Sequence, residues 1–180
     1  MKDPVQQRNE VLYRLDLAVT HLEASVTPLL VQDRGIALAY ALKGARDSDG
    51  VAAVPGGLVL RDGRPVAGRP CAFGADAPGA RIVLTAMKFD PLIRCAATIP
   101  FSELVLAGFR AMYLECSVLD NARKATGAGS MDFGVAACCN DGVPDVMYEA
   151  GTAKSPGVIH IFGEDPIVVT NNIIICSNRI

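Results

Sequence analysis

"GIALAYALKGARDSDGVAAVPGGLVLRDGRPVAG", residues 35–68, is the stretch that decides the fold class. Its apolar runs have the length of β-strands, and the turn signals "KGARDSDG", "VPGG" and "RDGR" separate them. The runs at 58–60 and 65–67 flank Asp62–Gly63, a pair that favours a tight hairpin turn. The stretch therefore predicts strands that are joined by short connections.

Helix signals lie on both sides of this stretch. Asp3 is a candidate N-cap before Pro4, and apolar residues follow at three-, four- and seven-residue spacings, which predicts a helix over about 4–26. In the last segment, Asp165–Pro166 favours a helix, whereas the isoleucines and valines after it favour a strand, and we predict a helix. Similar signals predict helices over 76–89, 90–99, 101–112 and 131–140, and strands over 112–120, 143–150 and 157–162.

The irregular alternation of strands and helices, with a hairpin included, predicts one α/β domain with a mixed sheet. We expect it to occupy residues 1–180, with the N-terminal helix at about 4–26 and an α/β body at about 35–180.

Composition excludes several classes of protein. The chain has 180 residues, of which 51% are hydrophobic and 20% charged, as in globular domains. Its net charge of −2 gives no general attraction to nucleic acids or acidic membranes. Its start, "MKDPVQQRNE", is too polar for a signal peptide, and no apolar run reaches the length of a membrane span. We expect a cytoplasmic protein with no membrane and no direct nucleic-acid partner.

Six cysteines and two histidines lack the spacing of a metal site. The cysteines form no C-x-x-C pair and several lie in apolar runs, so we interpret them as small buried hydrophobic residues. His21 falls on the polar face of the first helix, and His160 lies inside the strand "VIHIF". The P-loop, G-x-G-x-x-G and G-x-S-x-G patterns are absent from the sequence.

One glycine-broken turn has the composition of an anion site. "RKATGAGSMDFG", residues 123–134, places two cations before small residues and a predicted helix start. Free backbone N–H groups at a helix N-terminus suit an anion, so Gly127, Gly129 and Ser130 are candidate phosphate-binding residues. Glycine turns also precede many helices that bind nothing.

Charged residues stand at the ends of predicted elements. If they cluster at one sheet edge, the cations can bind a phosphorylated ligand and the carboxylates Mg²⁺. The alternative is a set of solvated charges. The residues are Arg46, Asp47, Arg81, Lys88, Asp90, Asp145 and Lys154.

Three longer stretches carry a family resemblance: "AYALKGARDSDGVAAVPGGLV", "AFGADAPGARIVLTAMKFDPLIRCA" and "GVPDVMYEAGTAKSPGVIHIFGEDP". Over about residues 5–170 the chain resembles the archaeal-type thiamine-phosphate synthase family, the ThiN domain. The resemblance implies a three-layer α/β/α fold with a mixed, largely antiparallel sheet, similar to class II aldolases but without their metal-binding histidines.

The reaction implied by the resemblance joins hydroxymethylpyrimidine diphosphate to thiazole phosphate and releases pyrophosphate. Such a site needs Mg²⁺ and cations on the departing pyrophosphate, for which Asp47 and Asp90 are the candidate Mg²⁺ ligands. The resemblance adds Phe73, Gly74 and Met87 to the candidate substrate-binding residues. The phosphate of thiamine phosphate or of its thiazole precursor would lie at "GAGS", residues 127–130, with help from Lys154.

The chain departs from the family at two positions. The family's "PGR" corresponds to a stretch ending in Gly57, and its "FGASSH" to one ending in Pro78. The implied catalytic arginine and histidine are therefore replaced by residues whose side chains can neither donate a proton nor carry a charge. Candidates to replace them are Arg61, Arg64, Arg69 and His21, of which Arg69 is closest to the altered stretch and is our catalytic candidate.

Three functions remain open. The chain is a thiamine-phosphate synthase, a catalytically silent domain that binds thiamine phosphate, or a structural or aldolase-like relative with another phosphorylated ligand. We expect a small phosphorylated ligand, a homo-oligomer and a separate pyrimidine kinase as a possible partner.

Overall fold

The structure is a computed structural model that describes residues 3–32, 34–119 and 132–180. The glycine turn with Gly127, Gly129 and Ser130 lies outside the described residues. The helices are α1 (Pro4–Ser25), α2 (Pro28–Val31), α3 (Ala77–Phe89), α4 (Glu103–Ala111), α5 (Phe133–Ala137) and α6 (Pro166–Ser177), with a 3₁₀ turn η1 (Ser48–Gly50). The strands are β1 (Ala37–Ala41), β2 (Val51–Ala53), β3 (Leu58–Arg61), β4 (Arg64–Ala67), β5 (Ala72–Phe73), β6 (Cys95–Pro100), β7 (Cys116–Val118), β8 (Val146–Glu149) and β9 (Val158–Gly163).

Seven strands form the main sheet, in the order β5-β2-β1-β6-β9-β8-β7. Every neighbouring pair is antiparallel except β7 and β8, which are parallel. Strand β6 lies at the centre, where Cys95 pairs with Tyr40 of β1 and with Gly163 of β9. The prediction of a mixed, largely antiparallel sheet is confirmed.

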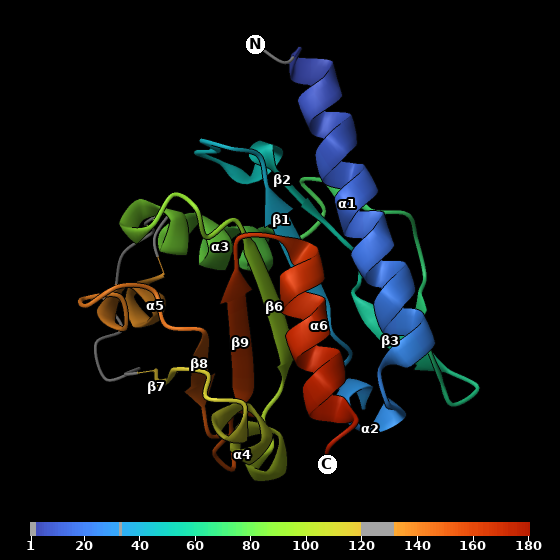
Figure 1. Ribbon diagram of the computed structural model, residues 1–180, viewed down its shortest axis with the longest axis vertical. Coiled ribbons are helices and arrows are strands. Elements are labelled where there is room, and N and C mark those ends of the chain that lie inside the picture. Colours follow the sequence, from blue (N-terminus) through green and yellow to red (C-terminus); the bar gives the residue numbers. More distant parts are fainter. Residues whose placement is uncertain (1–2, 33, 120–131) are drawn as a thin grey trace.

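Helices cover both faces of this sheet (Figure 1). Because side chains alternate along a strand, Leu38 and Tyr40 of β1 face the core that α1, α4 and α6 cover, whereas Ala39 and Ala41 face α3. The result is a three-layer α/β/α arrangement, as predicted. Two hydrophobic cores, one on each face, hold the layers together.

Helix starts were predictable because the same local signal recurs. The side chains of Asp3, Asp76, Ser102 and Asp165 each accept a hydrogen bond from a backbone N–H in the first turn of the following helix. In three of these helices a proline follows the cap directly or closely. The helix predicted for the last segment is confirmed as α6.

The predicted helix over 90–99 is wrong. Asp90 accepts a hydrogen bond from the N–H of Leu92 in a turn, and the chain then enters β6. Ala96 and Ala97 are strong helix formers, but here each belongs to a buried core on its own face of the central strand. Their small side chains let the covering helices α3 and α6 pack against β6. Tertiary packing overrides the local preference.

The predicted hairpin at 58–67 is confirmed as β3 and β4, which form a separate two-stranded sheet. It packs against α1, where the Glu23 carboxylate accepts a hydrogen bond of 2.7 Å from the N–H of Ala67. Among the described residues, no helix has both the length and the apolarity needed to cross a bilayer.

Candidate functional site

A pocket of about 440 Å³ lies between the β1–β2 connection and the C-terminal half of α3. We call it the loop–helix pocket. It brings together Arg46, Met87 and Lys88, three of the residues predicted from the sequence. The full lining consists of Gly44, Ala45, Arg46, Leu84, Met87, Lys88 and Pro91.

The loop side of the pocket is fixed by hydrogen bonds within the β1–β2 connection. The Asp47 carboxylate accepts a hydrogen bond of 3.1 Å from the N–H of Asp49 and so caps the start of η1. The N–H of Leu42 donates to the carbonyl of Gly50 at 2.9 Å, and this bond closes the base of the loop. Arg46 is exposed on this fixed loop, so its guanidinium can reach a ligand without backbone rearrangement.

The helix side of the pocket follows from the 3.6-residue period of α3. Leu84, Met87 and Lys88 stand at positions i, i+3 and i+4 and therefore share one face. Leu84 and Met87 are buried and form an apolar floor, whereas the Lys88 ammonium is exposed at the rim. Arg81, seven residues before Lys88, lies on the same face and is also exposed.

This arrangement suits a small anion that carries an apolar body. Two cations from different elements stand at one pocket, and a third lies along the same helix face. Charge-assisted hydrogen bonds from guanidinium and ammonium groups are the usual way proteins hold phosphate and pyrophosphate.

The candidate Mg²⁺ ligands are both engaged in turns. The carboxylate of Asp47 accepts the N–H of Asp49, and that of Asp90 accepts the N–H of Leu92 at 2.9 Å. Over the described ranges, no group of three or more His, Cys, Asp or Glu side chains is placed to hold a metal ion. A Mg²⁺ ion bound mainly through phosphate oxygens needs only one or two protein carboxylates, and Asp47 stands next to Arg46.

Asp145 and Lys154 do not line the loop–helix pocket, and they lie beyond opposite ends of β8, with Asp145 at the end of the sheet where β1 leads into that pocket. Asp145 directly precedes β8, and its carboxylate accepts a bond of 2.8 Å from the N–H of Glu115. Lys154 lies in the connection that follows β8, beyond the other end of that strand. The structure therefore does not bring these two predicted residues together.

Phe73, Gly74 and Arg69 lie near the β5 edge of the sheet. The Arg8 guanidinium stacks on the Phe73 ring at 3.7 Å from its centroid and donates to the carbonyl of Asp49. The N–H of Gly74 donates to the carbonyl of Val51 at 3.0 Å, which joins β5 to β2. Arg69 is exposed in the connection between β4 and β5. Its catalytic role stays a prediction.

Neither of the two departures from the family can supply a catalytic proton. Gly57 has a φ of +70°, and a Cβ atom placed there would lie 2.8 Å from the carbonyl oxygen of Ile36. Pro78 is exposed in the first turn of α3. With the backbone in this conformation, an arginine side chain at residue 57 would collide with the carbonyl oxygen of Ile36.

The histidines behave as predicted, whereas only three of the six cysteines, Cys95, Cys139 and Cys176, are buried as predicted. His21 is exposed, and the buried His160 forms a hydrogen bond of 2.8 Å between its Nδ1 and the Oγ1 of Thr98. Burial lowers the pKa of His160 to about 4, although the negative charge of Asp132 opposes this shift. The six cysteines are free thiols, and burial raises the pKa of Cys139 and Cys176 to about 11.

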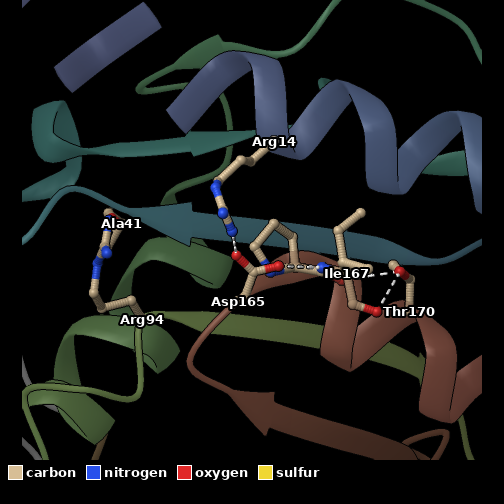
Figure 2. A network of polar contacts seen from close by, with 7 residues as sticks. Arg14, Ala41, Arg94, Asp165, Ile167 and Thr170 are labelled. Carbon is tan, nitrogen blue, oxygen red and sulfur yellow. Dashed lines mark hydrogen bonds and ion pairs between the residues drawn. The ribbon is translucent and has the colours of Figure 1, made fainter. Parts of the chain in front are cut away.

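The sequence patterns did not single out Arg94, which organises the end of β1 where the loop–helix pocket begins. Its Nε and Nη2 both donate to the carbonyl of Ala41, at 3.0 and 2.8 Å (Figure 2). Its guanidinium also lies over the Tyr40 ring. Figure 2 also shows Arg14 of α1 paired with Asp165, the N-cap of α6. Arg94 was missed because it fell inside the helix predicted over 90–99, whereas it directly precedes strand β6.

Comparison with known proteins gives two relatives and a family. A family profile described as "Thiamine-phosphate synthase ThiN" matches residues 14–175. The chain is 26% identical over 170 residues to the "Bifunctional thiamine biosynthesis protein ThiDN" of Methanocaldococcus jannaschii. The aligned region covers 92% of the chain and 40% of that protein. The chain is 30% identical over 126 residues to the "Thiamine-phosphate synthase ThiN" of Methanothermobacter thermautotrophicus, covering 66% of each. The chain spans less than two thirds of the length of either relative.

Two crystal structures have a similar fold. The C-terminal domain of protein MJ0236 superposes with a TM-score of 0.85 at 25% identity and covers 94% of both chains. The C-terminal domain of a phosphomethylpyrimidine kinase superposes with a TM-score of 0.82 at 24% identity, over 94% of this chain and 99% of that domain. The second likeness concerns the fold alone.

Proposed function

The chain belongs to the thiamine-phosphate synthase ThiN family, and on that premise we propose that it joins hydroxymethylpyrimidine diphosphate to thiazole phosphate. In this reaction the bond between the pyrimidine methylene carbon and the diphosphate oxygen breaks. A bond forms between that carbon and the thiazole nitrogen, and thiamine phosphate and pyrophosphate are the products. The observation that carries the proposal is the loop–helix pocket, where Arg46 and Lys88 converge inside the region that the family profile matches.

The chemistry asks the pocket to stabilise a leaving group, and its residues suit that task. As the carbon–oxygen bond breaks, negative charge accumulates on the pyrophosphate. The guanidinium of Arg46 and the ammonium of Lys88 can donate hydrogen bonds to it, and Arg81 adds positive charge along the same helix face. The apolar floor of Leu84 and Met87 can pack against the ring of the substrate.

We also propose that Mg²⁺ acts with the diphosphate, with Asp47 as its protein ligand and Asp90 as a second candidate. When bound, Mg²⁺ would neutralise charge on the leaving pyrophosphate. The homo-oligomer and the cytoplasmic location stay predictions. A separate pyrimidine kinase is a proposed partner, since the chain matches only 40% of a relative that is named as bifunctional.

A second function has its own support. Gly57 and Pro78 stand where the family resemblance implies an arginine and a histidine, and the carbonyl of Ile36 leaves no room for a side chain at residue 57. A domain that kept the ligand site without those groups would bind thiamine phosphate and not make it.

The test is product formation by the purified chain with both precursors and Mg²⁺. Synthesis predicts equal amounts of thiamine phosphate and pyrophosphate, and no product when a chelator removes Mg²⁺. If the folded chain binds thiamine phosphate but forms no product above the uncatalysed rate, the second function, a domain that binds without catalysis, is supported. A chain that neither binds nor synthesises thiamine phosphate has another ligand.

A further inference from the structure

A separate cavity of about 330 Å³ lies between α1 and the end of β1. We call it the Tyr40 pocket, because Tyr40 of β1 lines it together with Lys43, Arg94 and one face of α1. Tyr40 belongs to the core that α1 covers, whereas the loop–helix pocket lies beside α3, on the other face of the sheet. The two pockets have no lining residue in common.

The hydroxyl of Tyr40 is a polar group that the protein itself leaves without a partner. Only 3% of the residue is exposed, and no hydrogen bond reaches its hydroxyl from any residue that the structure describes. Within those same residues, the hydroxyl of Thr27 is the one fully covered side-chain polar atom that lacks a hydrogen bond. The Tyr40 hydroxyl therefore keeps access to the pocket, where a ligand can supply the missing bond.

This hydroxyl is suited to donate a hydrogen bond. Burial raises the pKa of the Tyr40 phenol, although the positive charges of Arg94 and Arg14 oppose that shift. The phenol therefore keeps its proton at neutral pH. A donor that points into a pocket calls for an acceptor atom on the ligand.

Arg94 supplies a cation that is already fixed in place. Its Nε and Nη2 donate to the carbonyl of Ala41, and Figure 2 shows the guanidinium held there. The carbon at the centre of the guanidinium lies 4.8 Å from the centroid of the Tyr40 ring. Across the described ranges its Nη1 has no acceptor, so this nitrogen can donate to a ligand. Because the side chain is held before binding, little of its entropy is lost when a ligand binds.

The charges around the pocket favour a ligand with a single negative charge. Lys43 is exposed, and no carboxylate of the described residues forms an ion pair with its ammonium. Glu10 of α1 brings one carboxylate to the opposite wall, next to Val11. The two cations thus exceed the carboxylate by one charge, and Glu10 would repel a phosphate dianion or a pyrophosphate.

The remaining surface and the volume limit the body of the ligand. The buried Val11, the half-buried Leu42 and the Tyr40 ring supply the apolar surface of the pocket. A volume of about 330 Å³ is at the small end of ligand pockets. It suits an organic acid with a short apolar chain or one ring.

We propose that the Tyr40 pocket binds a small organic monocarboxylate, with the carboxylate on the Tyr40 hydroxyl, Arg94 and Lys43 and the apolar part against Val11 and Leu42. Neither precursor of the synthase reaction is assigned to this pocket. The site stands or fails independently of that reaction.

The experiment titrates the full chain with a flat and a branched carboxylate, benzoate and isobutyrate, each paired with its neutral amide. NMR of the backbone amides reports the place of binding. At least one carboxylate is expected to shift the Leu42 and Lys43 signals in a saturable way at millimolar concentrations, and its amide is expected to leave them unchanged. If neither carboxylate shifts these signals, or if an amide shifts them equally, the proposal is wrong.

Two variants test the assigned groups. Tyr40→Phe keeps the ring and removes only the hydroxyl, and it is expected to raise the Kd for the carboxylate about 5-fold or more. Lys43→Gln is expected to raise it several-fold. Tyr13→Phe removes the same group from an exposed tyrosine of α1 outside the pocket and serves as the matched control, with a change below about 2-fold. Equal Kd values for Tyr40→Phe and Tyr13→Phe would overturn the proposal.

Thermal unfolding of the ligand-free variants separates binding from a structural role. Tyr40→Phe is expected to unfold at or above the temperature of the native chain, because its hydroxyl has no protein partner to lose. A clear drop in that temperature would show that the hydroxyl serves the fold and would contradict the proposal. Inorganic phosphate tests the class of anion: if it shifts the same signals at lower concentration than either carboxylate, the assignment to a monocarboxylate is wrong.

Discussion

Gly57 ends the turn that leads from β2 to β3, and the structure predicts that even a methyl group there is costly. A Cβ atom would lie 2.8 Å from the carbonyl oxygen of Ile36. That oxygen cannot move away freely, because it accepts a hydrogen bond of 2.7 Å from the N–H of Leu58. The N–H of Gly57 itself donates to the carbonyl of Val54 at 3.0 Å.

The magnitude follows from two terms. A side chain at a φ of +70° costs about 1–2 kcal/mol, because the Cβ atom crowds the following carbonyl. Displacing the carbonyl of Ile36 weakens a backbone hydrogen bond that contributes about 1 kcal/mol. Gly57→Ala should therefore lower the free energy of unfolding by about 2–3 kcal/mol.

The neighbouring Gly56 is the matched control. Its φ is +76°, and a Cβ atom on it would meet no other atom within 4 Å. Gly56→Ala should therefore cost only the conformational term, about 1–2 kcal/mol. Urea unfolding followed by far-UV circular dichroism measures both variants, since the chain has no tryptophan to report by fluorescence. A Gly57→Ala variant as stable as Gly56→Ala would refute the contact with Ile36.

Three further predictions concern the site and its surroundings. Arg46→Gln and Lys88→Gln should each weaken the binding of pyrophosphate about 10-fold or more without changing that of thiamine; unchanged pyrophosphate binding in both variants would separate the loop–helix pocket from the leaving group. His160 has a folded pKa of about 4, below the unfolded value of 6.5, so its contribution to stability is complete above pH 6.5 and falls by about 3 kcal/mol as the pH drops to 4. Urea unfolding across this range should show a smaller loss in His160→Asn, and an identical loss would contradict the low pKa. Arg94→Met should lower the free energy of unfolding by about 1–3 kcal/mol because the carbonyl of Ala41 loses both its guanidinium donors, and unchanged thermal unfolding would show that these bonds contribute nothing.

Much of the fold was predictable because it rests on local signals. The caps at Asp3, Asp76 and Asp165 and the turn at Asp62–Gly63 act through neighbours in the chain, so they could be read without the rest of the molecule. Strand β6 was missed because its alanines satisfy a packing requirement between two layers. That requirement exists only once the sheet has formed.

The candidate site shows the same division. The positive charges of Arg46 and Lys88 indicated an anion-binding site. The two residues are 42 positions apart in the chain, and they meet only because the β1–β2 connection folds against α3. Asp145 and Lys154 are likewise charged residues at the ends of predicted elements, yet they lie beyond opposite ends of β8. Charge was predictable from the sequence, and proximity was not.

The measurement that tests the central claim most directly is a calorimetric titration of the unaltered chain with thiamine phosphate, with thiamine as the control. The proposed synthase site predicts micromolar binding, about 8 kcal/mol, that requires the phosphate. Equal affinities for the two compounds, or no binding by a chain shown to be folded, would contradict the claim that this member of the family retains a thiamine-phosphate site.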